Sequence, residues 1–363
     1  MSLELKNISL AVEGHPHIYQ SNLKLEKATM NVLLGPTLSG KTTLMRIMAG
    51  LEKPSSGQII WNGKDITNCR LQDRDVAMVY QQFINYPTLS VYENIASPLR
   101  VMNKNKHEIE IAVKKAAEIL KISPYLDRKP IELSGGQQQR CALARALVKG
   151  AGLVLLDEPL ANLDYKLREE LREEIPKIFE RSGAIFVYAT TEPEEALLLG
   201  GNTAALFEGR IRQFGKTSQV YRNPKDIITA DVFSNPPMNF LKFRKKYKKL
   251  TFEGGISHTE TDHLSNLSDG DYIAGFRANH LDLTRKRAAQ IKFSVRVNHT
   301  EITGSETFIH MNYTGEKWIG LVKGVHNLDH AANIPVYLDL AHIYIFAEEG
   351  NLELSAFYAT KVK

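Results

Sequence analysis

Apolar residues form two kinds of pattern over residues 1–235. Short continuous apolar runs, which are typical of parallel strands buried on both faces, end near Leu34, Tyr80, Asp157 and Ala189. Between these runs, apolar residues three and four positions apart predict helices, which we place at residues 41–49, 91–121, 133–148 and 164–181. Strands that alternate with helices in this way predict an α/β domain, with a helical subdomain at about residues 86–150.

Further strands are predicted at the edges of this domain. Residues 3–12 and 23–34 have strand-like patterns and are separated by the polar segment 13–22, which we expect to be a loop. Residues 203–207 and 210–214 flank a Glu-Gly pair and predict a hairpin.

The pattern changes after Asn235, where two consecutive prolines cannot continue a helix. Short strand-like segments predominate from there on, at residues 272–276, 291–297, 307–311, 317–322, 334–338 and 343–346. They predict a second, all-β and barrel-like domain over residues 236–363.

The loop after the first buried strand contains the clearest chemical motif. Gly35, Pro36, Thr37, Leu38, Ser39, Gly40, Lys41 and Thr42 spell G-x-x-x-x-G-K-T between a strand and a helix, and Thr43 follows. Such a loop turns successive backbone N–H groups and a helix N-terminus toward an anion. We expect Lys41 to contact the β- and γ-phosphates of ATP and the Thr42 hydroxyl to hold Mg²⁺. The alternative is an ordinary Gly-rich turn between a strand and a helix.

Composition narrows the class of protein. The chain has 363 residues, of which 43% are hydrophobic and 24% charged, so it is long enough for two or three soluble domains. No apolar run approaches the 18 residues that would predict a membrane span, and we expect no secretion signal. Cys69 and Cys141 are too few for a disulfide framework, which fits a reducing compartment, and a net charge of +5 is too small to indicate nucleic-acid binding.

Leu133, Ser134, Gly135, Gly136 and Gln137 form a second motif, LSGGQ, at a predicted helix start. Alone, it is equally well explained as a capped helix. Twenty residues before a strand that ends in Asp157-Glu158, and after the phosphate-binding loop, it resembles the signature motif of the ATP-binding subunits of ABC transporters. The resemblance implies that these residues contact the ATP held by a facing subunit.

The same resemblance assigns roles to residues near the loop. Asp157 corresponds to the acid that holds Mg²⁺, Glu158 to the base that orients the attacking water, and Gln81 to a residue that contacts both Mg²⁺ and water. The alternative for two adjacent acids after a strand is a helix N-cap. Asp164 lies in a segment, ANLD, that resembles the loop for signalling between paired subunits.

Several segments resemble one branch of this family, which takes up sugars and polyols through maltose-, glycerol-3-phosphate- and especially glycerol-type systems. The segments are Arg74–Gln81, Val91–Asn94, Leu163–Arg168, Pro236–Asn239 and Gly304–Thr307. The branch implies a RecA-like P-loop core with antiparallel β and helical subdomains, followed by an OB-like (TOBE-type) regulatory domain. It also implies a second ATPase subunit, two transmembrane permease subunits and, indirectly, a solute-binding protein at the cytoplasmic face of a prokaryotic inner membrane.

Three positions depart from the family pattern. Val12 stands where an adenine-stacking aromatic residue is expected, Leu38 where a glycine or another small residue is usual, and Thr191 where a switch histidine reaches the γ-phosphate. His15, His17 or Tyr19 offers an aromatic substitute for Val12, or these are ordinary loop residues. Because all three departures fall on this chain's own phosphate half-site while LSGGQ is intact, we expect pairing with a different ATPase and slow hydrolysis at this site.

Two other functions remain open from the sequence. A regulatory subunit that binds ATP with little hydrolysis is favoured by Thr191 and opposed by Lys41, Asp157 and Glu158. A soluble ABC ATPase that acts on nucleic acid is disfavoured, because the chain has a single cassette. The basic cluster Lys242–Lys249 is interpreted as a solvated hairpin rather than a nucleic-acid or lipid surface, and we expect no nucleic-acid partner.

Overall fold

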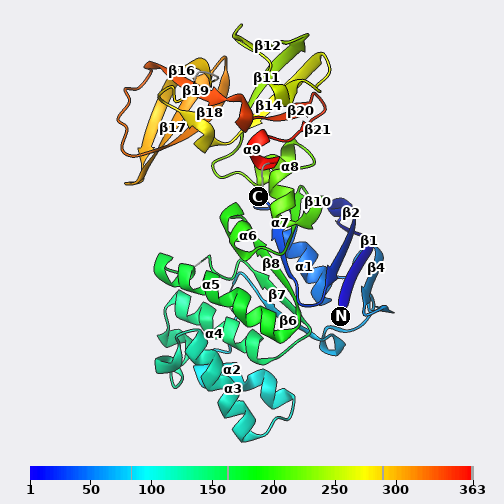
Figure 1. Ribbon diagram of the computed structural model, residues 1–363. Coiled ribbons are helices and arrows are strands. Elements are labelled where there is room, and N and C mark those ends of the chain that lie inside the picture. The colour runs from blue at the N-terminus through cyan, green and yellow to red at the C-terminus, as the bar shows by residue number, and fades with distance from the viewer. Residues whose placement is uncertain (83, 162, 288–289, 361–363) are drawn as a thin grey trace. The chain divides into compact units, whose positions relative to one another are not determined.

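The computed structural model describes residues 1–82, 84–161, 163–287 and 290–360. The chain divides into two compact units, Met1–Thr217 and Ser218–Lys363, called here the first and second unit (Figure 1). The division lies before the boundary that the sequence places at residue 235. Its physical reason is that the intervening residues bond to the C-terminal part of the chain: Asp226 pairs with Asn351, and the Ile227 N–H donates to the Gly350 carbonyl at 2.9 Å.

A six-stranded sheet forms the centre of the first unit, in the order β10-β9-β3-β8-β7-β6. Its strands are β10 (Arg210–Lys216), β9 (Asn202–Phe207), β3 (Met30–Leu34), β8 (Ile185–Thr190), β7 (Leu153–Asp157) and β6 (Val76–Val79). All neighbours are parallel except β9 and β10, which form the predicted hairpin. Every residue of β7 and β8 is buried, as the continuous apolar runs predict.

A second, antiparallel sheet has the order β2-β1-β4-β5. Its strands are β1 (Ser2–Val12), β2 (His15–Glu26), β4 (Ser56–Trp61) and β5 (Lys64–Asp65). The predicted loop 13–22 is wrong, because only Glu13 and Gly14 form the turn, both with positive φ, and β2 then pairs along β1. The predicted strand 23–34 is likewise divided into the end of β2 and β3 by a turn after Glu26.

Helices complete the first unit. The loop helix α1 (Lys41–Ala49) has the predicted bounds and ends at Gly50, whose φ of 84° requires glycine. The predicted helix 91–121 is two helices, α2 (Val91–Val101) and α3 (Lys106–Ile119), because Asn103 has a positive φ and Asn105 with Glu108 forms a capping box that starts α3. The others are α4 (Gly135–Val148), α5 (Tyr165–Ser182) and α6 (Pro193–Leu199), and α4 packs against α2 and α3.

The second unit contains two antiparallel sheets, in the orders β13-β12-β11-β14-β20-β21 and β15-β19-β16-β17-β18. The strands of the first sheet are β13 (Ser257–Thr259), β12 (Lys249–Phe252), β11 (Asn239–Lys246), β14 (Gly270–Phe276), β20 (Tyr344–Ala347) and β21 (Leu352–Leu354). Those of the second are β15 (Leu281–Asp282), β19 (Asn333–Asp339), β16 (Gln290–Ile302), β17 (Glu306–Tyr313) and β18 (Glu316–Lys323). The short helices are α7 (Thr217–Arg222), α8 (Ile227–Val232) and α9 (Phe357–Thr360).

Aromatic side chains fill the core between these two sheets. Phe276 and Phe293 place their edges against the ring of Trp318, with centroids 5.0 and 5.4 Å apart, and Trp318 is 1% exposed. The predicted all-β character of this region is thus confirmed.

The basic cluster Lys242–Lys249 forms the predicted hairpin, with the turn at Tyr247 between β11 and β12. One of its residues is not solvated as expected. Lys245 is 4% exposed, because it faces the core side of β11 and donates to the Leu264 carbonyl at 2.9 Å while pairing with Glu260 at 2.6 Å.

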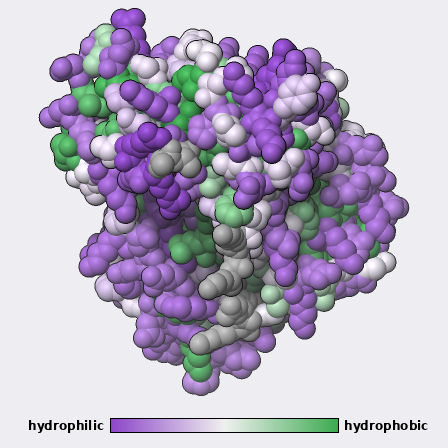
Figure 2. Space-filling model, turned by 45° about the horizontal axis from the view of Figure 1, so that its top comes forward, coloured by the Kyte–Doolittle hydropathy of each residue, from purple (hydrophilic) through white to green (hydrophobic). Residues whose placement is uncertain are grey.

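The visible surface in Figure 2 is mainly hydrophilic, with apolar residues in scattered patches. Within the described ranges, none of the helices combines the length and the hydropathy that a membrane span needs.

Candidate functional site

The loop between β3 and α1 has a backbone that few sequences allow. Leu38 and Gly40 both have positive φ, at 66° and 98°. A Cβ atom at Gly35 would lie 2.3 Å from the Leu206 carbonyl oxygen and 2.6 Å from Ser39 Oγ, so only glycine fits there. Leu38 is tolerated because its side chain is 95% exposed and meets no steric barrier, although a left-handed leucine costs about 1 kcal/mol.

Lys41 is folded back over this loop. Its Nζ donates to the carbonyl oxygens of Gly35 at 2.8 Å and Pro36 at 3.0 Å, and it lies 4.0 Å from Glu158 Oε1. Burial lowers the pKa of Lys41, and the carboxylates of Glu158 and Asp157 oppose that shift. A buried ammonium held by two carbonyls is thus available to an anion in the loop.

Thr42 and Asp157 meet directly, although 115 residues separate them. Thr42 Oγ1 donates to Asp157 Oδ2 at 2.7 Å, while Asp157 Oδ1 is buried with no hydrogen-bond partner in the structure. Burial raises the pKa of Asp157, and the Thr42 hydroxyl and Lys41 lower it. A hydroxyl and a carboxylate with a spare oxygen are ligands that suit Mg²⁺, so the residues present fit this ion.

Glu158 follows on a strained backbone, with φ at 46°. Its Oε2 accepts from Gln81 Nε2 at 3.0 Å, so Gln81 contacts Glu158 here rather than the Thr42–Asp157 pair. Burial raises the pKa of Glu158, Lys41 lowers it, and the carboxylates of Asp157, Glu195 and Glu192 raise it further. Asp157, Glu158 and Lys41, the predicted metal ligand, base and phosphate-binding lysine, therefore lie close together at the ends of β3 and β7, next to the end of β6.

These groups open into a cavity of about 700 Å³. Besides residues 37–43, Gln81 and Glu158, its lining includes Thr191 and the aromatic residues His17 and Tyr19. Val12 is 42% exposed and is not among the lining residues, and neither is His15. Of the aromatic substitutes weighed for Val12, the structure therefore places two at the cavity.

The LSGGQ residues lie elsewhere on the first unit, at the start of α4. Ser134 and Gln137 form a capping box, in which Gln137 Oε1 accepts from the Ser134 N–H at 2.9 Å. Ser134 and Gly135 are exposed, while Leu133 is buried beneath them. The motif is thus the helix cap of the simpler interpretation, and its Ser134 and Gly135 are exposed at the surface of the first unit.

The segment after Glu158 is only partly described. Asp164 caps α5 by accepting from the Leu167 N–H at 3.0 Å. Asn162 of the predicted signalling loop lies outside the described residues.

The sequence motifs did not predict two buried polar residues near the site. Gln139, 1% exposed, donates from α4 to the Pro159 carbonyl and so ties the LSGGQ helix to the Glu158 loop. Glu195, 5% exposed, accepts from Thr190 Oγ1 at 2.6 Å behind Thr191. A polar side chain on the buried face of an amphipathic helix is the signal that points to both.

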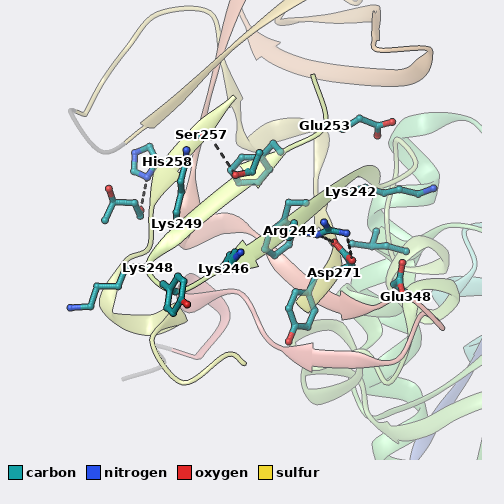
Figure 3. A pocket seen from close by; sticks show the side chains of 17 residues that line it. Lys242, Arg244, Lys246, Lys248, Lys249, Glu253, Ser257, His258, Asp271 and Glu348 are labelled. Carbon is teal, nitrogen blue, oxygen red and sulfur yellow. Dashed lines mark hydrogen bonds and ion pairs between the residues drawn. The ribbon is translucent and has the colours of Figure 1, made fainter. Parts of the chain in front are cut away.

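The largest cavity described, about 1210 Å³, lies far from this chemistry in sequence, along β11 and β12 in the second unit (Figure 3). Lys242, Lys246 and Lys248 line it beside an Arg244–Asp271 pair with contacts of 2.6 and 2.7 Å. Size alone does not make it the active site, because the groups suited to phosphate and metal lie in the smaller cavity.

A phosphate-binding loop, a threonine–aspartate pair and a neighbouring glutamate define a P-loop ATPase, and the exposed LSGGQ narrows the class. The family described as "ABC transporter" matches residues 18–161. The sn-glycerol-3-phosphate import ATP-binding protein UgpC of Psychromonas ingrahamii is 33% identical over 354 residues, 95% of this chain and 93% of that protein. The trehalose/maltose import ATP-binding protein MalK of Thermococcus litoralis is 34% identical over 91% of this chain and 93% of that protein.

Solved structures of ATP-binding cassettes resemble this chain as well. A dimeric, post-hydrolysis state of the ATP-binding cassette MJ0796 bound to ADP and Pi is 26% identical, with a TM-score of 0.55, and covers 59% of this chain and 98% of its own. The chain belongs to the ATP-binding, ATP-hydrolysing subunits of ABC importers. The resemblance stated from the motifs is thereby confirmed.

Proposed function

We propose that this chain powers the import of glycerol-3-phosphate, glycerol or a sugar by hydrolysing Mg²⁺-ATP. The observation that carries the chemistry is the hydrogen bond from Thr42 to the buried Asp157, whose second carboxylate oxygen has no hydrogen-bond partner in the structure. Relatives named for glycerol-3-phosphate and for trehalose/maltose import support this solute class.

The tasks are then divided among these residues. Residues 35–43 would hold the phosphates, Thr42 and Asp157 would hold Mg²⁺, and Glu158, which accepts a hydrogen bond from Gln81, would accept a proton from the attacking water. The bound metal supplies positive charge that neutralises the phosphate oxygens. Lys41 exchanges its bonds to the loop carbonyls for bonds to phosphate, which compensates the cost of its burial.

We assign the proposed partners to surfaces of the first unit. Ser134–Gln137 completes the site of a second ATPase subunit, and Asp164 reports on that pairing. A cavity of about 320 Å³ lined by Leu71, Tyr86 and Val101 presents apolar side chains, with Val101 83% exposed, to one of two transmembrane permease subunits. The chain then works at the cytoplasmic face of a prokaryotic inner membrane, supplied indirectly by a solute-binding protein, and residues 236–363 regulate it.

Reconstitution with the permease subunits tests the proposal. Proteoliposomes that contain the chain, its partners and a loaded solute-binding protein are expected to hydrolyse ATP faster with glycerol-3-phosphate or glycerol than without solute. Absence of stimulation by any of these polyols or by maltose would remove the proposed solute class. Heparin binding together with salt-sensitive retention of DNA would instead revive a nucleic-acid partner.

The site is proposed to be the slower half of a mixed pair. Thr191 lines the cavity where a titratable imidazole would place the water, and threonine carries no charge. We expect Glu158→Gln to lower hydrolysis by the mixed pair less than about tenfold, and the matching change in the partner to lower it more than about 100-fold. Phosphate release and solute uptake are the measurements.

Glu118→Gln, an exposed change on α3, is the matched control and leaves both rates unaltered. Equal losses from the two site variants would contradict the asymmetry. Unchanged hydrolysis by the mixed pair on Glu158→Gln, with nucleotide binding intact, would favour the regulatory alternative.

Tyr19 is proposed to contact the base in place of Val12. The Arg210 guanidinium lies 3.5 Å over one face of its ring, which leaves the other face for adenine. Tyr19→Ala is expected to raise the dissociation constant of ATP by about 5- to 150-fold, since stacking on an aromatic side chain contributes about 1–3 kcal/mol per base. His17→Ala is expected to have a smaller effect of the same sign.

Inorganic tripolyphosphate separates this contact from the phosphate site. Its affinity is expected to be unchanged by Tyr19→Ala, and Val12→Ala is the control that changes neither ligand. An equal loss of affinity for ATP and tripolyphosphate would show that Tyr19 supports the loop rather than the base.

A further inference from the structure

An irregular pairing of β16 with β17 in the second unit determines which side chains face outward. Val297 pairs with Met311, and both are buried, but the next pair is His299 with His310, so Asn298 is an extra residue. With regular pairing, His299 would stand opposite Ile309, which is 0% exposed. The bulge therefore turns His299 to the outer face, beside His310.

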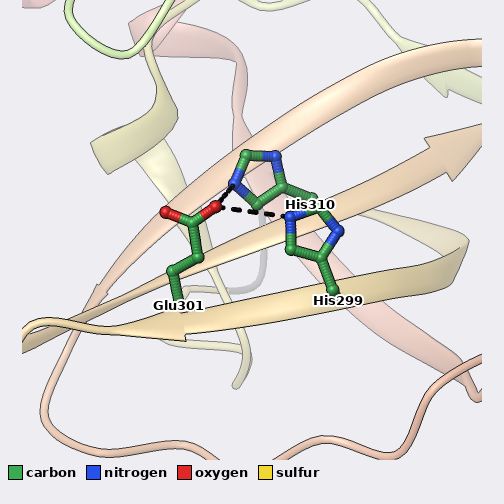
Figure 4. A group of neighbouring side chains, drawn as sticks. All are labelled: His299, Glu301 and His310. Carbon is green, nitrogen blue, oxygen red and sulfur yellow. Dashed lines mark hydrogen bonds and ion pairs between the residues drawn. The ribbon is translucent and has the colours of Figure 1, made fainter.

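Glu301 follows two residues later on the same face of β16. Its Oε1 lies 3.3 Å from His299 Nε2 and 3.2 Å from His310 Nε2, as Figure 4 shows. Ligand atoms at about 2.0–2.1 Å from a tetrahedral Zn²⁺ lie about 3.3 Å from each other. The two distances to Glu301 match that spacing, and all three ligand atoms lie within 4.8 Å of one another.

The arrangement is poorly explained by hydrogen bonds alone. Nε2 of His310 is buried and lacks a hydrogen bond in the structure, although Glu301 is near. The two imidazole rings stack with centroids 4.1 Å apart and an angle of 10°. An imidazole ring offers a nitrogen lone pair to a cation, so the two rings and the carboxylate can supply three ligand atoms at this place.

We propose that His299, Glu301 and His310 form a binding site for a divalent late first-row transition metal ion such as Zn²⁺. Two imidazoles and a carboxylate are a ligand set that suits zinc, with water in the open position. The ion joins β16 to β17 beyond the bulge and so fixes the end of this hairpin. Within the described part of the chain, no other cluster of this kind brings three such ligands together.

Zn²⁺ titration of the full chain, freed of metal and nucleotide, tests the site. Isothermal calorimetry is expected to give one binding event in the wild type that His299→Ala or His310→Ala weakens more than tenfold and Glu301→Gln weakens less. His330→Ala, an exposed histidine of the same unit, is the matched control and keeps the event. Any zinc bound at Thr42 and Asp157 or by the cysteines binds equally to the wild type and the variants. The difference between their isotherms therefore reports the proposed site alone.

Cu²⁺ provides a second measurement. Electron paramagnetic resonance of the wild type with one equivalent of Cu²⁺ is expected to show hyperfine coupling to two imidazole nitrogens, and the signal requires no variant to fold. Zn²⁺ isotherms that coincide for the wild type and the three variants would overturn the proposal, as would a copper spectrum without nitrogen coupling. A loss of binding equally large in His330→Ala would overturn it too.

Discussion

Replacing Asp157 by asparagine is expected to make the nucleotide-free chain more stable while lowering ATP hydrolysis by about 10²- to 10³-fold. Burial holds the pKa of Asp157 above its value in the unfolded chain. A carboxyl of this kind loses its contribution to stability as pH rises from the unfolded pKa through the folded one, so at neutral pH the folded state bears the cost of the ionised group. Asparagine removes that cost and still accepts from Thr42.

The expected gain in the free energy of unfolding is about 0.5–2 kcal/mol, measured as a higher thermal midpoint at pH 7. This difference shrinks as the pH falls through the raised pKa of Asp157 and is gone below the ordinary range of aspartate. The loss of hydrolysis follows because the proposed metal site keeps a hydroxyl but loses its negative ligand. Asp127→Asn, an exposed aspartate, is the control for both measurements. A lower midpoint for Asp157→Asn in the absence of nucleotide would contradict the argument.

Replacing Arg74 by alanine is expected to destabilise the first unit by about 3–5 kcal/mol. Arg74 is 8% exposed, and its guanidinium donates to five backbone carbonyls. These belong to Ile47, Met48, Ile66, Thr67 and Cys69. The first two lie in the last turn of α1, where helical carbonyls have no partner within the helix. Ile47 and Ile66 also accept from the N–H groups of Gly50 and Cys69, so the loss of the guanidinium falls mainly on the Met48, Thr67 and Cys69 carbonyls behind the phosphate-binding helix.

The two tryptophans allow the measurement to be assigned, because Trp61 lies in the first unit and Trp318 in the second. Urea unfolding followed by Trp61 fluorescence in a Trp318→Phe background is expected to shift to lower denaturant for Arg74→Ala. Arg74→Lys should be intermediate, since an ammonium lacks the planar fork. Exposed Arg70→Ala is the control, and an equal shift there would contradict the assigned role.

Local patterns predicted the elements whose burial can be inferred from the hydrophobicity of their own residues. The run 152–159 and the helix 41–49 are examples, since continuous apolar residues or a glycine stop define them without reference to a partner. The prediction of a loop for the polar segment 13–22 was wrong for the opposite reason. His15 to Gln20 form a strand only because β1 offers a row of backbone groups to pair with.

The sequence by itself determined the loop of Gly35–Thr42, the LSGGQ cap, the α/β order and the β-strand character of the chain after residue 236, because each depends on residues close together in the chain. Tertiary structure alone decided that Thr42 meets Asp157, that Tyr19 rather than Val12 lines the cavity, and that a bulge sets His299 opposite His310. Those relations depend on strand order and register, which are set by the joint burial of distant segments and leave no mark at any single position.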